Sequence, residues 1–171
     1  MSQRRLPPGI VAVEPGVGQE SVWDYPRPPR IDPVAARIRV VVAGRTIADT
    51  LQALRVVETA GAPVYYLPPA DIDLAHLRPT DHSSVCEWKG VASYFDHDDG
   101  VHRIPAIAWA YRRPEPGYGA IRDHLAFYAS RVDEAWVGGE RARPQPGGFY
   151  GGWVTDAIVG PIKGEPGSQF W

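Results

Sequence analysis

The chain has one cysteine, Cys86, and two lysines, Lys89 and Lys163, among its 171 residues. A single cysteine cannot form an intramolecular disulfide, and a structural zinc site needs about four cysteine or histidine ligands at short spacings. The sequence therefore predicts neither a disulfide framework nor a bound metal. Also missing are a secretory signal peptide and any apolar run of about 18 residues. We therefore expect a cytoplasmic protein of bacterial type without a membrane partner.

An excess of positive charge is absent as well. The formal net charge is −2, whereas nucleic-acid-binding proteins usually carry a basic face, so the sequence predicts no nucleic-acid partner. Arginine nevertheless outnumbers lysine by sixteen to two. Because arginine holds planar anions through a bidentate fork, this imbalance is compatible with an anion site, although a genome-wide composition bias is the simpler explanation. The chain also lacks a phosphate-binding loop, a dinucleotide fingerprint and the G-x-S-x-G elbow of serine hydrolases.

Proline and glycine divide the chain into three zones. Residues 1–36 hold seven prolines, which are excluded from helix interiors and central strands, so we expect a proline-rich arm. Trp23 and Tyr25 predict that this arm docks on the core. Residues 37–137 form the predicted core domain. Residues 138–171 hold nine of the eighteen glycines and several aromatic residues, and we expect them to wrap the core as an extension.

Short apolar segments with a period of two residues predict a mainly β core built from small antiparallel sheets. Strands are expected at residues 37–42, 46–48, 54–58, 63–67, 90–95 and 106–111, with a hairpin at 135–142. Helical spacing predicts one turn within residues 70–77, and a short helix or helical turn leading into a strand within residues 120–136. The fold should therefore contain at most one or two short helices.

The strand at residues 106–111 has an alanine at every second position. Successive side chains of a strand point to opposite faces, so its three alanines would lie on one face. Ile107, Trp109 and Tyr111 would lie on the other face, where they either fill a core or line a cavity.

Reactive residues are concentrated in residues 80–90, a segment that we expect to be a loop before a strand. The thiolate is the nucleophilic form of cysteine, and a nearby cation stabilises it. Lys89 follows Cys86 by three residues, and Arg55 is a second candidate cation from another strand. The alternative is that Cys86 is a small buried core residue, since free cysteine is among the most buried residue types.

Three functions are compatible with these residues. The first is a small-molecule-binding β domain with an aromatic pocket that carries a few polar groups. Its predicted lining residues are Arg55, Tyr66, His82, Cys86, Lys89, Trp109 and Tyr111. The second is a thiol-dependent enzyme with Cys86 as nucleophile and Lys89 as its catalytic partner. The third is a structural protein or homodimer that associates through its aromatic flanks. The sequence identifies no cofactor.

Several segments, in their order and spacing, resemble the bacterial domain-of-unknown-function family 427 across residues 37–137. These segments are residues 48–50, 54–58, 63–68, 86–94 and 108–111. The flanks at residues 21–26 and 143–153 resemble those of a longer subgroup. The resemblance implies a β-tent, the antiparallel fold of methionine sulfoxide reductase B, but it implies no activity. Relatives with this fold often bind zinc through two cysteine pairs, and this chain has none, so we expect the fold without its zinc site.

The same family is also labelled a nucleotidyltransferase domain. Polymerase-type enzymes of that class need a Gly-Ser turn followed by paired aspartates that hold Mg²⁺. Asp71 and Asp73 supply such a pair, but Ala62 follows Gly61 where serine is required. The label therefore implies no mechanism for this chain.

Overall fold

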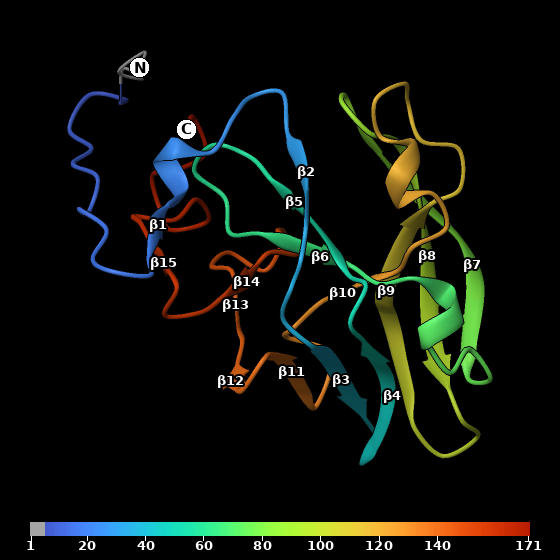
Figure 1. Cartoon of the computed structure of the whole chain (residues 1–171). Coiled ribbons are helices and arrows are strands. Elements are labelled where there is room, and N and C mark those ends of the chain that lie inside the picture. The colour runs from blue at the N-terminus through green and yellow to red at the C-terminus, as the bar shows by residue number, and fades with distance from the viewer. Residues whose placement is uncertain (1–5) are drawn as a thin grey trace.

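The computed structural model describes residues 6–171, and nearly all of its regular structure is β (Figure 1). The first five residues of the expected arm lie outside the described residues. The strands are β1 (Glu20–Ser21), β2 (Arg30–Pro33), β3 (Ile38–Val42), β4 (Arg45–Thr50), β5 (Leu54–Val57), β6 (Val64–Tyr66), β7 (Leu77–Cys86), β8 (Gly90–Asp98), β9 (Arg103–Tyr111), β10 (Ala126–Phe127), β11 (Glu134–Val137), β12 (Glu140–Arg141), β13 (Arg143–Pro144), β14 (Trp153–Val154) and β15 (Ile158–Val159). Single 3₁₀ turns are formed by Val22–Asp24, Pro69–Asp71 and Gly119–Ile121. The predicted mainly β fold is thereby confirmed.

The strands form three larger sheets and two small ones. Antiparallel pairing gives the orders β10-β9-β8-β7, β12-β11-β3-β4 and β2-β5-β6, while β13 pairs with β14 and β1 pairs in parallel with β15. In Figure 1 the long β7-β8-β9 sheet stands on the right, and the β2-β5-β6 sheet lies in the centre. The paired terminal segments, with β1 and β15, lie on the left.

Strand β3 shows why the alternating pattern predicts its structure correctly. Its positions Ile38, Val40 and Val42 are buried, while the residues between them are only half-buried. β3 is central because β4 and β11 pair with it on either side. Ala43 and Gly44 connect β3 to β4 with φ angles of 51° and 74°, as the commonest two-residue hairpin turn requires.

The predicted loop at residues 80–90 is wrong over most of its length, because β7 continues through it to Cys86. β7 is the outer strand of its sheet and pairs only with β8. Most of its residues are exposed on both faces, so the sequence has no apolar alternation there. An edge strand of this kind leaves no periodic signal.

The predicted faces of residues 106–111 are correct only in part. Trp109 and Tyr111 pack in one cluster and the alanines at 108 and 110 in another, as expected. Ile107, however, packs with the alanines in the main core. The register of β8 and β9 shifts nearby, and Ala106 has a φ of 46°, which is the mark of a bulge that interrupts simple alternation.

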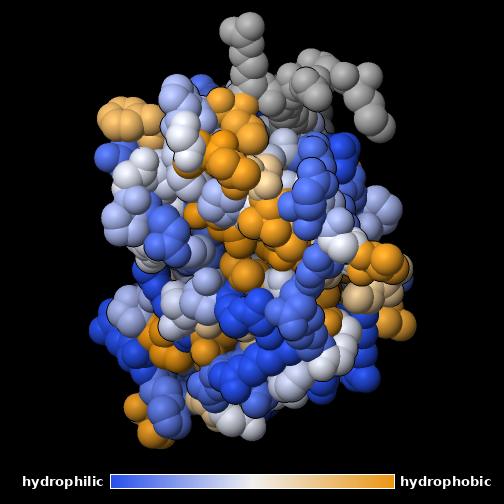
Figure 2. Space-filling view, turned by 90° about the vertical axis from the view of Figure 1, so that its left-hand side faces the viewer, coloured by the Kyte–Doolittle hydropathy of each residue, from blue (hydrophilic) through white to orange (hydrophobic). Residues whose placement is uncertain are grey.

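Both terminal segments contribute buried residues to a cluster of their own. Val22, Trp23 and Tyr25 are buried against Val57 and Ile158. Figure 2 looks onto the side of the molecule where the terminal segments lie, and it shows a band of apolar side chains bordered by charged ones. The N-terminal arm exposes further valines at positions 11, 13 and 17.

No helix in the described part of the chain is long and apolar enough to span a bilayer.

Candidate functional site

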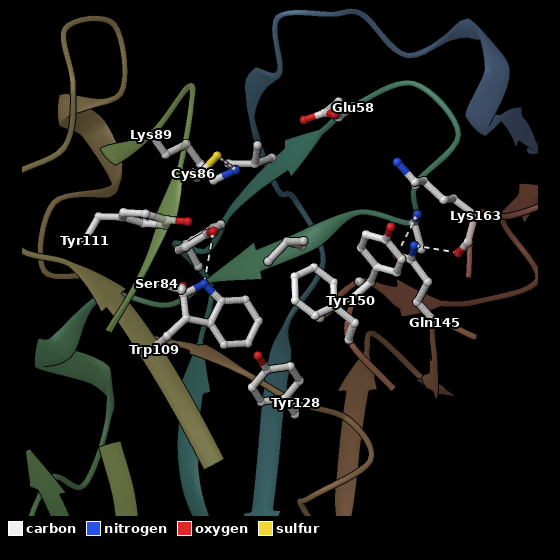
Figure 3. Close-up of a pocket in the computed structure, with 18 of the residues that line it drawn as sticks. Glu58, Ser84, Cys86, Lys89, Trp109, Tyr111, Tyr128, Gln145, Tyr150 and Lys163 are labelled. Carbon is white, nitrogen blue, oxygen red and sulfur yellow. Dashed lines mark hydrogen bonds between the residues drawn. The ribbon is translucent and has the colours of Figure 1, made fainter. Parts of the chain in front are cut away.

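A cavity of about 330 Å³ opens between the β2-β5-β6 sheet, the β7-β8-β9 sheet and the C-terminal extension (Figure 3). Aromatic side chains form much of its wall, and the polar groups come from distant parts of the chain. The lining residues include Val56, Glu58, Tyr66, Ser84, Cys86, Lys89, Tyr94, Trp109, Tyr111, Tyr128, Gln145, Tyr150, Gly151, Gly152 and Lys163.

The aromatic wall is organised around Trp109 of β9. Its ring lies 4.6 Å from that of Tyr128 and meets Tyr66 of β6 nearly edge-on, with ring centroids 6.5 Å apart. The indole Nε1 donates a hydrogen bond to the Tyr66 hydroxyl at 3.4 Å. Tyr111 follows Trp109 by two residues on the same strand and lies 6.3 Å from Tyr66. Strands from two sheets therefore bring these rings together.

The cysteine and the first lysine are held together by the turn between β7 and β8. β7 ends at Cys86 and β8 begins at Gly90, whose φ of 105° favours glycine. The Lys89 Nζ donates to the Cys86 Sγ at 3.3 Å and also lies 5.7 Å from the centre of the Tyr111 ring. Both Cys86 and Lys89 are half-buried, so thiol and ammonium contact each other at the cavity wall.

The second lysine enters the cavity from the C-terminal extension. The Lys163 Nζ donates to the main-chain oxygen of Trp171 at 3.1 Å and lies 5.5 Å from the centre of the Tyr150 ring. The buried Gln145 side chain fixes this segment, because its Nε2 donates to the Lys163 oxygen at 2.8 Å and its Oε1 accepts from the Ala62 N–H at 3.1 Å. Figure 3 shows Lys89 and Lys163 on opposite sides of the cavity.

Two adjacent glycines allow the extension to approach the cavity closely. A Cβ atom at Gly151 would lie 2.0 Å from the Trp109 ring, and one at Gly152 would lie 2.3 Å from the Gln145 Oε1. Real atoms do not approach so closely, so any side chain at these positions would displace the wall of the cavity.

The charged side chains of the cavity wall, among the described residues, are those of two lysines and one glutamate. Neither lysine forms an ion pair with an Asp or Glu side chain in the described residues. Glu58 is the one acidic lining residue among those described, and its carboxylate lies 3.4 Å from the Arg27 guanidinium. Glu58 is therefore partnered by Arg27, whereas Lys89 and Lys163 have no acidic side-chain partner in the described residues.

Burial raises the pKa of three phenols that line the cavity. It is the largest cause that raises the pKa of Tyr66 and Tyr111 above the ordinary tyrosine value, and it raises the pKa of Tyr128 to about 12. At neutral pH these side chains are O–H groups that can donate hydrogen bonds. Together with the two ammonium groups they make the cavity rich in donors.

The structure places five of the seven predicted site residues along this cavity: Tyr66, Cys86, Lys89, Trp109 and Tyr111.

Arg55 and His82 are not among the lining residues. The Arg55 guanidinium lies 2.6 Å from the Glu20 carboxylate and 3.2 Å from that of Asp32. Its hydrogen bond is the largest cause that lowers the pKa of Glu20. His82 is exposed on β7, where its ring lies 4.4 Å from that of Tyr94. Arg55 therefore joins the N-terminal arm to the core, and His82 covers an outer face.

The sequence interpretation missed Tyr128, Gln145, Tyr150 and Lys163. Only Lys163 had a usable signal, because it is the second of two lysines in a chain with sixteen arginines. The other residues have common side chains in segments without a strong pattern, and only the folded chain brings them to the cavity.

The model of a family described as a domain of unknown function, DUF427, matches residues 30–138. The resemblance that the sequence segments indicate is thereby confirmed. No curated protein matches the chain.

Proposed function

The chain belongs to the DUF427 family, and we propose that this member binds a small molecule in the cavity lined by Trp109. One observation carries the proposal: the only cysteine and both lysines of the chain line the same cavity. The other basic side chains of the chain are those of its sixteen arginines and five histidines. Two lysines that come from segments far apart in the sequence are therefore brought to one place.

The size and lining of the cavity support this proposal. Ligand pockets commonly enclose about 300–1,000 Å³ and combine apolar walls with a few polar groups. At about 330 Å³ the cavity lies at the small end of that range. It therefore suits a ligand with one or two rings.

A thermal-shift screen against a metabolite collection tests the proposal. A ligand present at about a hundred times its Kd stabilises the folded state by about 2.7 kcal/mol. For a chain of this length we expect that to raise the Tm by about 5–10 °C. The matched control is the same chain with Cys86 alkylated by N-ethylmaleimide, which fills one side of the cavity and should abolish the shift. If no compound shifts the Tm, or if the alkylated chain responds equally, the proposal is wrong.

A second candidate function is a thiol-dependent enzyme. The observation that favours it is the 3.3 Å contact between the Lys89 Nζ and the Cys86 Sγ. The thiol of cysteine reacts through its thiolate, which is the form that attacks an electrophilic carbon of a bound molecule. This candidate requires Cys86 to react in the folded chain. A thiol that becomes reactive only on unfolding would exclude it.

A further inference from the structure

The polar groups of the cavity differ in what they still offer to a ligand. Gln145 is already engaged, because its side-chain oxygen and nitrogen each have a main-chain partner. The Ser84 hydroxyl is paired with that of Tyr94 at 2.8 Å. Each lysine ammonium group makes one of the hydrogen bonds described above and has further N–H donors to offer. A ligand that satisfies them must present acceptors.

The two lysines are not equivalent. Lys163 already donates to a main-chain oxygen at 3.1 Å, and such oxygens are strong acceptors. The one hydrogen bond of the Lys89 Nζ in the described residues goes to the Cys86 sulfur, which is a weak acceptor. Lys89 is also half-buried beside the Tyr111 ring, where a charge is less well solvated than in water. Lys89 therefore attracts an anionic group more strongly than Lys163 does.

The arrangement of the lysines indicates how much charge the ligand carries. Lys89 and Lys163 lie on opposite sides of the cavity (Figure 3), so they do not converge on one group. A phosphate with two negative charges is usually held by several converging donors, such as an arginine fork or a row of main-chain N–H groups. A single ammonium group matches a single negative charge. The cavity thus favours a carboxylate over a phosphate.

The aromatic wall indicates the shape of the rest of the ligand. Trp109 and Tyr66 line the cavity with their rings nearly perpendicular to each other, and aromatic rings bind flat apolar groups by offset or edge-on stacking. From the charge and the wall together, and on the basis of the proposed binding function, we infer that the ligand is a planar monocarboxylate. Its carboxylate pairs with Lys89, and its ring system packs against Trp109 and Tyr66.

The test uses 2-naphthoate and its neutral analogue 2-naphthamide as probes, with Kd measured by calorimetry on the full chain. A hydrogen bond to a charged group contributes about 1.5–3 kcal/mol, so we expect 2-naphthoate to bind at least about tenfold more tightly. In Lys89→Met the two probes should bind with nearly equal Kd values, about onefold apart. The affinity for 2-naphthamide should stay close to that of the native chain. Lys89→Arg should restore part of the preference, because it keeps the charge.

Two further variants serve as comparisons. Lys163→Met should reduce the preference for 2-naphthoate less than Lys89→Met does. Arg103→Met removes an exposed cation from the far end of β9 and should leave the preference intact. Equal affinity for the two probes, or a preference that survives Lys89→Met, would overturn the inference while leaving a binding function in place. Failure of both probes to bind also overturns it, and the metabolite screen then decides the proposed function separately.

Discussion

Replacing Trp153 with alanine should lower the free energy of unfolding by about 3–5 kcal/mol, the usual cost of removing a large buried aromatic side chain. Trp153 is 1% exposed and its ring lies 5.1 Å from that of Tyr65 in the main core. Its Nε1 also donates to the Phe127 oxygen at 2.8 Å, and alanine would leave that buried acceptor without this partner. Urea denaturation of the native chain and the variant measures the difference.

Trp136→Ala is the matched control for this experiment. Trp136 is half-buried on β11, where its Nε1 contacts the Glu134 side chain at 3.3 Å. Its replacement should cost about 1 kcal/mol, the typical value for a point substitution. If the two variants were equally stable, Trp153 would not be the residue that fixes the C-terminal extension to the core.

The second large effect is expected from Gly151→Val. A Cβ atom at this position would overlap the Trp109 ring at 2.0 Å, so either the extension or the indole must move. Overpacking of this kind costs about 1–3 kcal/mol, and here it also displaces a wall of the cavity. We expect the Kd for 2-naphthoate to rise by at least about tenfold, which calorimetry measures.

Gly139→Ala separates the cavity effect from the general cost of replacing a glycine. A Cβ atom at Gly139 has no neighbour within 4 Å. This variant should keep both the native stability and the native Kd. A Gly151→Val variant that binds 2-naphthoate as the native chain does would show that the ligand does not touch this part of the wall.

The elements that the sequence predicts well are those with one buried and one solvated face. β3 is the clearest case, since its three apolar positions point into the core and its neighbours do not. β7 could not be recognised in the same way, because an edge strand exposed on both faces carries no alternation. Ile107 was assigned to the wrong face because a bulge at Ala106 interrupts β9, and bulges leave little trace in a sequence.

The candidate site could be predicted only where its residues are unusual or regularly spaced. Cys86 and Lys89 are rare residue types close together, and Trp109 and Tyr111 share one face of a strand. Arg55 shows the limit of this reasoning. Its neighbour Val56 lines the cavity, so the alternation of β5 turns Arg55 toward Glu20 instead. The packing of the sheets decides which face of β5 lines the cavity. The local sequence of β5 carries no information about that packing.

Lys163 lies on the C-terminal extension, far from Lys89 along the chain, and Gln145 holds its segment against the turn at Ala62. Contacts between segments so far apart in sequence have no local pattern. The sequence prediction missed it, and only composition could have pointed to it, because lysine is rare in the chain. Rarity of a residue type was therefore more informative here than spacing.

The most direct measurement of whether Cys86 shares a positively charged cavity is its rate of alkylation by iodoacetate relative to iodoacetamide. The two reagents deliver the same electrophilic carbon with and without a negative charge. A positive cavity raises the local concentration of an anion by about tenfold or more, so we expect the ratio of rates to be about tenfold higher in the folded chain than in urea. Lys89→Met should bring it close to the unfolded value. The same ratio in the folded and unfolded chain, or a Cys86 that neither reagent modifies before unfolding, would contradict the existence of this site.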